Sequence, residues 1–158
     1  MPEPTASVPD TTHSPHATTG FHRVLTGQLE EIPELASGLS QWAQAAHIPA
    51  RTIVSMNLML DELITNIVCH GYARAGGMID VQSDCKDDAW VVTLTDHAFA
   101  YDPLQATAPD TTLGLEDRDI GGLGVHFIRK LADALRYERL EVAGQGANRL
   151  HITKRLNP

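Results

Sequence analysis

The chain of 158 residues is 42 % hydrophobic and 5 % aromatic, which is the composition of one globular domain of ordinary size. Its 12 basic and 20 acidic residues give a net charge of −8, which disfavours direct binding of nucleic acid. No apolar run approaches the roughly 20 residues of a membrane span, and the two cysteines, Cys69 and Cys85, cannot build a disulfide framework, so we expect a cytoplasmic protein that does not enter a membrane.

The first segment of the chain is rich in proline and threonine. Residues 1–20 hold four of the nine prolines, and this composition cannot bury enough apolar surface to offset the loss of chain entropy. We therefore expect a disordered tail at residues 1–20 and one domain at residues 21–156. Patterns in that domain predict an edge strand at residues 21–26, two helices at 29–47 and 52–72, and a hairpin of strands 78–83 and 89–95. A polar segment at 104–120, either a lid or a disordered insert, precedes a third helix at 123–131 and a closing hairpin of strands 137–140 and 149–153.

The predicted helices and strands define a fold class. Leu35, Leu39 and Trp42 recur on one side of the first helix, and Pro33 suits its first turn. The strands of the first hairpin alternate apolar and polar positions, which suits a sheet with one face on a core. Three helices that cover one face of such a sheet form an α+β two-layer sandwich, and we expect the sheet to be mixed but mostly antiparallel.

The second helix carries polar side chains in an otherwise apolar sequence. In the segment ELITNIVCHGY, residues 62–72, Glu62, Asn66 and His70 recur every four residues and share one helix face. A neighbouring apolar stripe, which begins at Met56, can dock on the sheet. A carboxylate, an amide and an imidazole beside such a stripe suit a general base, an oxygen ligand for Mg²⁺ and a supporting group. A solvated helix face is the alternative interpretation.

Two more motifs follow in the sequence. The segment DHAFAYDP, residues 96–103, begins where an alternating strand ends, and the segment GGLGVHFIRKL, residues 121–131, opens a helix. Glycines at a helix start let backbone N–H groups converge on phosphate oxygens, and the positive end of the helix dipole favours their charge. The glycine motif lacks the Gly-Lys-Ser/Thr ending of a Walker loop and the βα unit of a dinucleotide fingerprint. Its position after the other two motifs is what favours a phosphate site.

Together the three motifs resemble the N, G1 and G2 boxes of the GHKL ATP-binding (Bergerat) fold, the family of gyrase, Hsp90, histidine kinases and MutL. More closely, the chain resembles the small bacterial anti-sigma-factor serine/threonine kinases. Their pattern is Glu-Leu-x-Thr-Asn-x-x-x-His-Gly/Ala-Tyr, then Asp-x-Gly-x-x-Phe-Asp-Pro, then Gly-Gly-x-Gly before a helix. The resemblance covers residues 21–156 and implies an ATP-dependent protein serine/threonine kinase with ATP and Mg²⁺ as cofactors.

The resemblance also implies a role for each motif residue. It places Asp96 on adenine, because a carboxylate accepts a hydrogen bond from the 6-amino group and cannot receive one from the oxo group of guanine. It makes Glu62 the base that takes a proton from the attacking oxygen, and Asn66 the residue that holds Mg²⁺ through its amide oxygen. His70 is expected to order the helix. The other nucleotide-binding residues that the resemblance implies are Ala98, Tyr101, Gly121, Gly122, Leu123, Gly124 and Val125.

In such kinases the attacking oxygen belongs to a serine of a partner protein. The implied partner is a STAS-domain antagonist protein, and the resemblance also allows a sigma factor as a second partner and a homodimer as the assembly. Three alternatives stay open: a non-catalytic, nucleotide-dependent binding module, a histidine-kinase catalytic domain, and an ATPase of the gyrase or Hsp90 kind. A histidine kinase needs a phosphoacceptor histidine, but His22 and His47, which flank the first helix, lack a following acidic residue.

Ala98 departs from the family pattern, which has glycine two residues after the aspartate. A glycine there lets the backbone approach the base or take a positive φ, and alanine with a positive φ costs on the order of 1 kcal/mol. We therefore expect Ala98 to weaken nucleotide binding and Ala98→Gly to tighten it by about tenfold. The binding-module alternative rests mainly on this residue.

Overall fold

The computed structural model describes residues 20–105 and 122–156. Apart from Gly20, the expected tail at residues 1–20 lies outside this part. Of the expected lid or insert at residues 104–120, only Leu104 and Gln105 lie inside it. Gly121, the first glycine of its motif, also lies outside the described residues. The disorder of the tail and the two interpretations of the insert therefore stay predictions.

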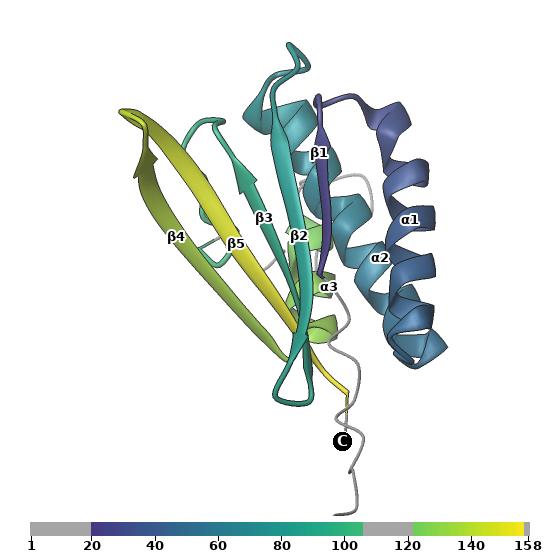
Figure 1. Cartoon of the computed structure of the whole chain (residues 1–158). Coiled ribbons are helices and arrows are strands. Elements are labelled where there is room, and N and C mark those ends of the chain that lie inside the picture. Colours follow the sequence, from purple (N-terminus) through teal and green to yellow (C-terminus); the bar gives the residue numbers. More distant parts are fainter. Residues whose placement is uncertain (1–19, 106–121, 157–158) are drawn as a thin grey trace, which may run out of the picture.

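The described residues form a layer of helices on one face of a five-stranded sheet (Figure 1). All four strand pairings are antiparallel, which confirms the α+β two-layer sandwich and leaves no parallel component within the described residues. The strands, in their order across the sheet, are β1 (Phe21–Leu25), β2 (Ile79–Lys86), β3 (Ala89–Asp96), β5 (Gln145–Arg155) and β4 (Ala134–Val142). As expected, β1 is an edge strand.

The hairpins extend closer to their turns than the sequence pattern predicted. Asp87 and Asp88 join β2 to β3, and both have a positive φ, 51° and 57°. Ala143 and Gly144 join β4 to β5 with φ values of 51° and 77°. Two consecutive residues with positive φ match the right-handed twist of paired strands, so the ladder continues up to a two-residue turn. Charged residues that the sequence pattern predicted to lie in the loop therefore belong to strands.

The first helix begins with a short 3-10 turn. This turn, η1 (Leu29–Glu31), leads directly into α1 (Ile32–Ala45). The Glu31 carboxylate accepts hydrogen bonds from the backbone N–H groups of Thr26 at 2.9 Å and Gln28 at 3.1 Å. Acceptors at this position satisfy backbone donors that a helix start leaves unpaired. Pro33 occupies the first turn of α1, as the sequence predicted.

The second helix is the longest in the fold. It consists of α2 (Ala50–Asn66) and the π-helical turn η2 (Ile67–Gly71). Ala50–Gly71 is 22 residues long and contains an 18-residue window with a mean hydropathy of 1.3, so by length and composition this helix could cross a membrane, which corrects the expectation from the sequence that no segment approaches such a size. In this fold, however, the helix buries its apolar side against the sheet and leaves Arg51 and Asp61 exposed. That periodicity is typical of a core helix.

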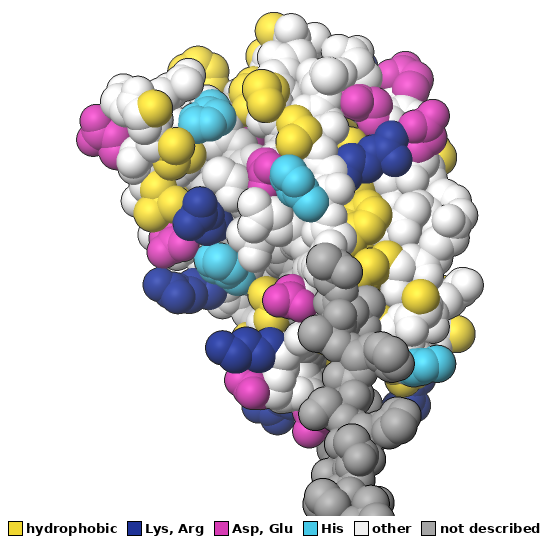
Figure 2. Space-filling model, viewed as in Figure 1, with side chains coloured by type: hydrophobic (Ala, Val, Ile, Leu, Met, Phe, Trp, Pro, Cys, Tyr) yellow, Lys and Arg dark blue, Asp and Glu magenta, His cyan; other side chains and the backbone are white. Residues whose placement is uncertain are grey.

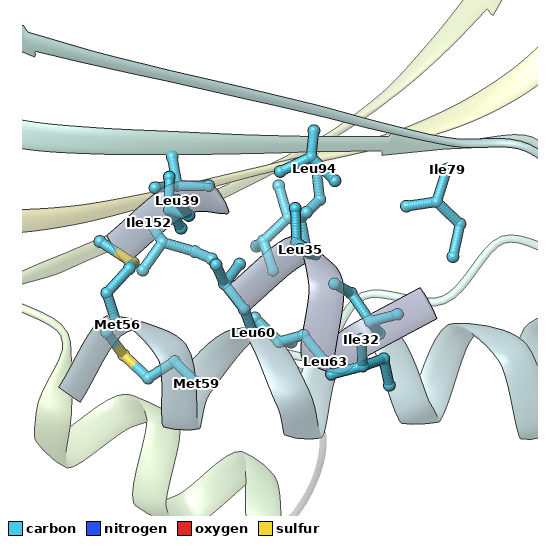
Figure 3. Close-up of a cluster of buried hydrophobic side chains, with 14 of the residues drawn as sticks. Ile32, Leu35, Leu39, Met56, Met59, Leu60, Leu63, Ile79, Leu94 and Ile152 are labelled. Carbon is cyan, nitrogen blue, oxygen red and sulfur yellow. The ribbon is translucent and has the colours of Figure 1, made fainter. Parts of the chain in front are cut away.

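The core lies between α1, α2 and the sheet (Figure 3). Trp90 of β3 is fully buried, and its indole N–H donates to Ser83 Oγ at 2.7 Å. Trp42 packs at the margin of the core, with its ring centroid 6.3 Å from that of Trp90. The side chains labelled in Figure 3 are Ile32, Leu35, Leu39, Met56, Met59, Leu60, Leu63, Ile79, Leu94 and Ile152. This packing fixes α2 against β3, the two elements that carry the candidate site.

The opposite face of the sheet is open and carries charged and histidine side chains (Figure 2). His22 of β1 contacts Asp80 of β2 at 2.6 Å, and His151 of β5 contacts Glu138 of β4 at 3.2 Å. These are cross-strand pairs on a solvated surface, and such pairs contribute about 0.2–1 kcal/mol each. The open face therefore fits a solvated side of the sheet rather than a second core.

Candidate functional site

Two of the predicted site residues are hydrogen-bonded to each other on α2. Asn66 Nδ2 donates to Glu62 Oε1 at 3.2 Å, and both side chains are half-buried. This bond uses the amide NH₂ group, so the amide oxygen of Asn66 stays available as a ligand. The side chain of His70, which was expected to share their face and to order the helix, is exposed in η2 and forms no hydrogen bond with the described residues. The site on this helix is therefore a pair rather than a triplet.

The third helix, α3 (Gly122–Leu131), approaches α2 closely at this pair. A Cβ atom at Gly124 would overlap the carboxylate of Glu62. Glycine at this position therefore lets the first turn of α3 lie directly against the candidate base. The glycine motif thus has a second purpose beside the backbone N–H groups that the sequence analysis considered: it makes room for Glu62.

Gly124→Ala tests this close approach. The added methyl would displace the Glu62 carboxylate, because that carboxylate is the free end of a long side chain and can turn away. We expect the phosphoryl transfer implied by the resemblance to fall at least tenfold, while the free energy of unfolding stays within about 1 kcal/mol of wild type, since alanine favours a helix more than glycine does. Transfer assays and urea unfolding measure the two quantities.

The matched control is Gly38→Ala in the middle of α1. There a new Cβ would lie 3.4 Å from the Phe21 ring, which is an ordinary contact, and the position is remote from Glu62. We expect this variant to gain stability by about 0.5–1 kcal/mol and to keep full transfer. Equal transfer rates in both variants would show that transfer does not depend on the position of the Glu62 carboxylate.

Asp96 closes β3 at the end of the sheet and is only 4 % exposed. Its Oδ1 atom accepts hydrogen bonds from the backbone N–H of Ala98 at 2.9 Å and from Asn148 Nδ2 at 2.8 Å. Burial raises the pKa of the carboxyl group, although these two hydrogen bonds partly oppose the shift. Among the described residues both bonds end on Oδ1, so Oδ2 is available to a donor from a ligand.

The sequence analysis missed Asn148, which holds Asp96 in place. Asn148 is 7 % exposed and lies directly opposite Asp96 in the pairing of β3 with β5. Its amide oxygen accepts hydrogen bonds from Tyr137 Oη and from an Arg139 Nη atom, both at 2.8 Å, which fixes the amide orientation. No local motif marks Asn148, because its role depends on the register of strands that are 52 residues apart. Only the strand pairing itself could have revealed it.

Ala98 fits the structure without the strain that the sequence analysis expected. Its φ is not positive, so the expected cost of about 1 kcal/mol does not arise. Its side chain is buried at 6 % exposure and faces Gly71, where a Cβ atom would lie 2.9 Å from the Cβ of Ala98. The methyl group thus packs against a glycine at the end of α2. The expectation that Ala98→Gly tightens nucleotide binding therefore no longer follows from backbone strain; the closer approach of the backbone to the base that glycine would allow stays a prediction.

A pair of substitutions tests whether Ala98 and Gly71 are complementary. Gly71→Ala would bring two methyl groups to about 2.9 Å, well inside the optimum of about 3.5–4.0 Å, so we expect a loss of about 1–3 kcal/mol in stability. Adding Ala98→Gly to that variant should recover most of the loss. Urea unfolding of the two single variants and the double variant gives the coupling. Purely additive effects would show that the two positions do not share one space.

Tyr72 links the two halves of the site. Its hydroxyl donates to the carbonyl of Met78 and accepts from the backbone N–H of His97, each at 2.8 Å. A Cβ atom at Gly77 would overlap the Tyr72 ring, so the ring lies directly against the chain just before β2. The end of α2 is therefore tied to the ends of β2 and β3. This connection fixes the distance between the Glu62 pair and Asp96.

The loop after Asp96 is tied to α3. Asp102 Oδ1 accepts from the backbone N–H of Leu104 at 2.8 Å, and the Arg129 guanidinium donates to the carbonyls of Pro103 and Leu104. Tyr101 is 51 % exposed beside this turn.

The remaining predicted residues lie in α3. Val125 is buried at 4 % exposure and packs in the interior, so only its backbone can face a ligand. Gly122 and Leu123 lie in the first turn of α3. The structure therefore brings Asp96, Ala98 and Tyr101 to the end of the sheet, and Glu62, Asn66 and Gly124 to the contact of α2 with α3.

These residues fit a magnesium nucleotide. Within residues 20–105 and 122–156, no three His, Cys, Asp or Glu side chains cluster as a metal site. Magnesium in nucleotide sites usually takes one or two protein oxygens, with phosphate and water oxygens completing its shell. The amide oxygen of Asn66 supplies a ligand of that kind beside a helix start that favours phosphate, and Glu62 lies next to it as the candidate base. Asp96 supplies an acceptor at the other end, where a base with an exocyclic amino group fits.

The fold and the site define a class, the nucleotide-binding α+β domain with three helices over one sheet face. Residues 25–154 match the family described as the histidine kinase-like ATPase domain, and the chain belongs to this family. It is also similar to the serine/threonine-protein kinase BtrW of Bordetella bronchiseptica, with 32 % identity over 111 residues. That alignment covers 69 % of this chain and 75 % of BtrW.

Two solved structures share the fold. The SiaB-SiaC complex from Pseudomonas aeruginosa contains a chain that matches with a TM-score of 0.64 and 16 % identity, over 85 % of this chain and 88 % of that one. The structure of the RsbU and RsbW domains of Rv1364c from Mycobacterium tuberculosis matches with a TM-score of 0.59 and 17 % identity. It covers 87 % of this chain, which spans 32 % of the larger protein. At this identity the likeness concerns the fold alone.

Proposed function

We propose that this chain is an ATP-dependent protein serine/threonine kinase of the anti-sigma switch type that phosphorylates a STAS-domain antagonist protein. The observation that carries the proposal is the Glu62–Asn66 pair, which lies against Gly124 at the start of α3. A carboxylate and an amide beside a phosphate-binding helix start are the groups that phosphoryl transfer to a hydroxyl requires. The similarity to the kinase BtrW supports the same activity.

Each group has a defined duty in this proposal. Asp96 accepts a hydrogen bond from the adenine amino group, with Ala98 and Tyr101 beside it. Asn66 holds Mg²⁺ through its amide oxygen. The backbone of the glycine motif, which consists of Gly121, Gly122, Leu123, Gly124 and Val125, donates to the phosphates.

Glu62 acts on the partner's serine. When bound, Mg²⁺ and ATP supply a γ-phosphoryl group whose negative charge is partly neutralised. Glu62 takes the proton of the serine hydroxyl as the serine oxygen bonds to the γ-phosphorus and the bond to the bridging oxygen of the departing ADP breaks. Asn66 Nδ2 binds one carboxylate oxygen of Glu62 and so orients the other toward the hydroxyl.

The partners belong to the same proposal. One structure that shares the fold was solved as the SiaB-SiaC complex, which suggests by analogy that this chain works through a protein partner. We propose a STAS-domain protein as the phosphoacceptor, a sigma factor as a second partner, and a homodimer in the cytoplasm as the working form. We also propose that residues 21–156 form the kinase domain and that residues 1–20 are a disordered tail.

The rival proposal of a non-catalytic binding module rested on Ala98. The backbone of Ala98 takes no positive φ and its methyl group packs against Gly71, so the backbone strain that supported this rival does not arise. The retained Glu62–Asn66 pair favours a catalytic protein instead.

A transfer assay tests the kinase proposal. The chain is incubated with labelled ATP, Mg²⁺ and, one at a time, the purified STAS-domain proteins encoded by the same genome, and phosphoserine is detected by mass spectrometry. We expect one of them to be phosphorylated at a single serine. A chain that binds both ATP and a STAS-domain protein without forming phosphoserine above a no-enzyme control would overturn the kinase proposal in favour of the binding module.

A further inference from the structure

Exposed apolar side chains lie on the outer surface of α2 and α3. Leu58 of α2 and Phe127 of α3 are each 57 % exposed, although both helices already bury an apolar side. Val54, one turn before Leu58, is 67 % exposed and extends the group. Clustered large apolar side chains on a surface indicate a contact with another molecule. We call Val54, Leu58 and Phe127 the seam patch.

The two helices run in opposite directions. α2 leads to Gly71, which faces Ala98 just beyond the end of β3. α3 ends at Leu131, whose carbonyl accepts a hydrogen bond at 2.7 Å from Lys154, the residue opposite Trp90 near the start of β3. The helices therefore pass each other antiparallel.

Leu58 and Phe127, the two seam-patch residues nearest the candidate base, lie beside it as a result. Leu58 precedes Glu62 by four residues, and Phe127 follows Gly124 by three residues. Because the helices are antiparallel, Leu58 and Phe127 are displaced in the same direction along the contact between α2 and α3. Each side chain is thus about one turn, about 5.4 Å, from the contact of Glu62 with Gly124.

We propose that the seam patch is the docking surface for the phosphoacceptor protein, an inference that rests on the proposed kinase function. The acceptor serine has to come within hydrogen-bond distance of Glu62, and a specific protein interface covers about 800 Å² on each partner. An interface of that size around Glu62 also covers residues one turn away. An acceptor bound with its serine at Glu62 therefore also contacts the seam patch.

The chemistry of the surface describes the acceptor. The seam patch is accompanied on the same two helices by the exposed charged residues Arg51, Asp61 and Lys130. An apolar centre with charged residues around it is the usual arrangement of a protein interface. The partner that fits is a folded protein with apolar side chains next to its acceptor serine and polar groups of both signs around them.

A second copy of this chain fits the surface less well. A homodimer built on the seam patch would cover the surface beside Glu62 and close it to any acceptor. A dimer that is compatible with transfer has to use another part of the molecule. We therefore assign the seam patch to the acceptor.

The double variant Leu58→Gln/Phe127→Gln tests the proposal. Both side chains are exposed, so a polar replacement leaves the core intact. We expect the KM for the STAS-domain acceptor to rise more than tenfold, while kcat at saturating acceptor and the Kd for ATP stay within twofold of wild type. The control is Val24→Thr, which changes an apolar side chain that is 41 % exposed on the open sheet face and should change none of these values.

Each contrary result has a distinct meaning. An unchanged acceptor KM overturns the docking proposal. If only the Kd for ATP becomes weaker, the patch supports the nucleotide site of this chain and not the acceptor. If only the dimer is lost, the patch binds a second copy of the chain. If wild type binds a STAS-domain protein without phosphorylating it, the kinase proposal fails, and the docking surface is then judged from the binding affinity of the double variant by calorimetry. If wild type binds no STAS-domain protein, both proposals fail.

Discussion

Glu62→Gln is expected to lower the rate of transfer to serine by about 10² to 10⁴ while ATP binding stays unchanged, because this is the usual share of a general base. Glutamine keeps the shape of the side chain and can still accept the hydrogen bond that Asn66 Nδ2 makes at 3.2 Å. It cannot take a proton from the acceptor hydroxyl. Single-turnover transfer with labelled ATP, together with calorimetry, measures the two effects separately.

Two further variants on the same helix serve as comparisons for Glu62→Gln. Asp61→Asn changes a neighbouring exposed carboxylate at the edge of the docking surface, so we expect wild-type single-turnover transfer from it at saturating acceptor. Asn66→Ala should lose Mg²⁺-dependent ATP binding as well as transfer, because it removes the proposed metal ligand and the partner of Glu62. Wild-type transfer by Glu62→Gln would mean that Glu62 is not the base. Loss of ATP binding in that variant would make it a ligand instead.

Much of the fold follows from the sequence because its signals are local. The alternation along β2 and β3 and the helical spacing of Leu35 and Leu39 report which side of each element is buried, so the two-layer sandwich could be predicted. Glu62 and Asn66 were paired correctly because a spacing of four residues places side chains together on any α-helix. Asp96 was placed at a strand end by the same local pattern.

The rest depends on contacts between distant segments. Asn148 meets Asp96 only through the register of β5 against β3, and Gly71 meets Ala98 only through the packing of α2 against the end of the sheet. The strain expected at Ala98 came from the family pattern, whereas the actual residue has no positive φ, and a glycine opposite makes room for its methyl group. His70 shows the limit of spacing alone, since it keeps the interval of four and yet lies exposed in a π-helical turn.

Asp96→Asn is expected to weaken ATP binding more than tenfold, because hydrogen bonds from the protein fix the orientation of the new amide. The Ala98 N–H and Asn148 Nδ2 both donate to Oδ1, so an amide oxygen stays at that position and the NH₂ group takes the place of Oδ2. A donor then faces the adenine amino group, which is itself a donor. Calorimetry with ATP measures the loss, and Asp80→Asn, on the open face of the neighbouring strand, is the control that should keep wild-type affinity.

The same variant should not lose stability, and the pKa of Asp96 gives the reason. Burial raises this pKa above its ordinary value of 3.8, so protonation favours the folded state; the contribution of the group to stability is complete below 3.8 and is lost as the pH rises through the raised pKa. Above the raised pKa wild type holds a buried, ionised carboxylate, and the neutral amide of the variant avoids the cost of burying that charge. We expect the free energy of unfolding of Asp96→Asn to equal or exceed that of wild type at pH 7, with the difference shrinking as the pH falls toward 3.8. If the variant lost affinity and stability together at pH 7, the carboxylate would be a structural group, whereas lost affinity with retained stability identifies a charge that the fold keeps for its ligand.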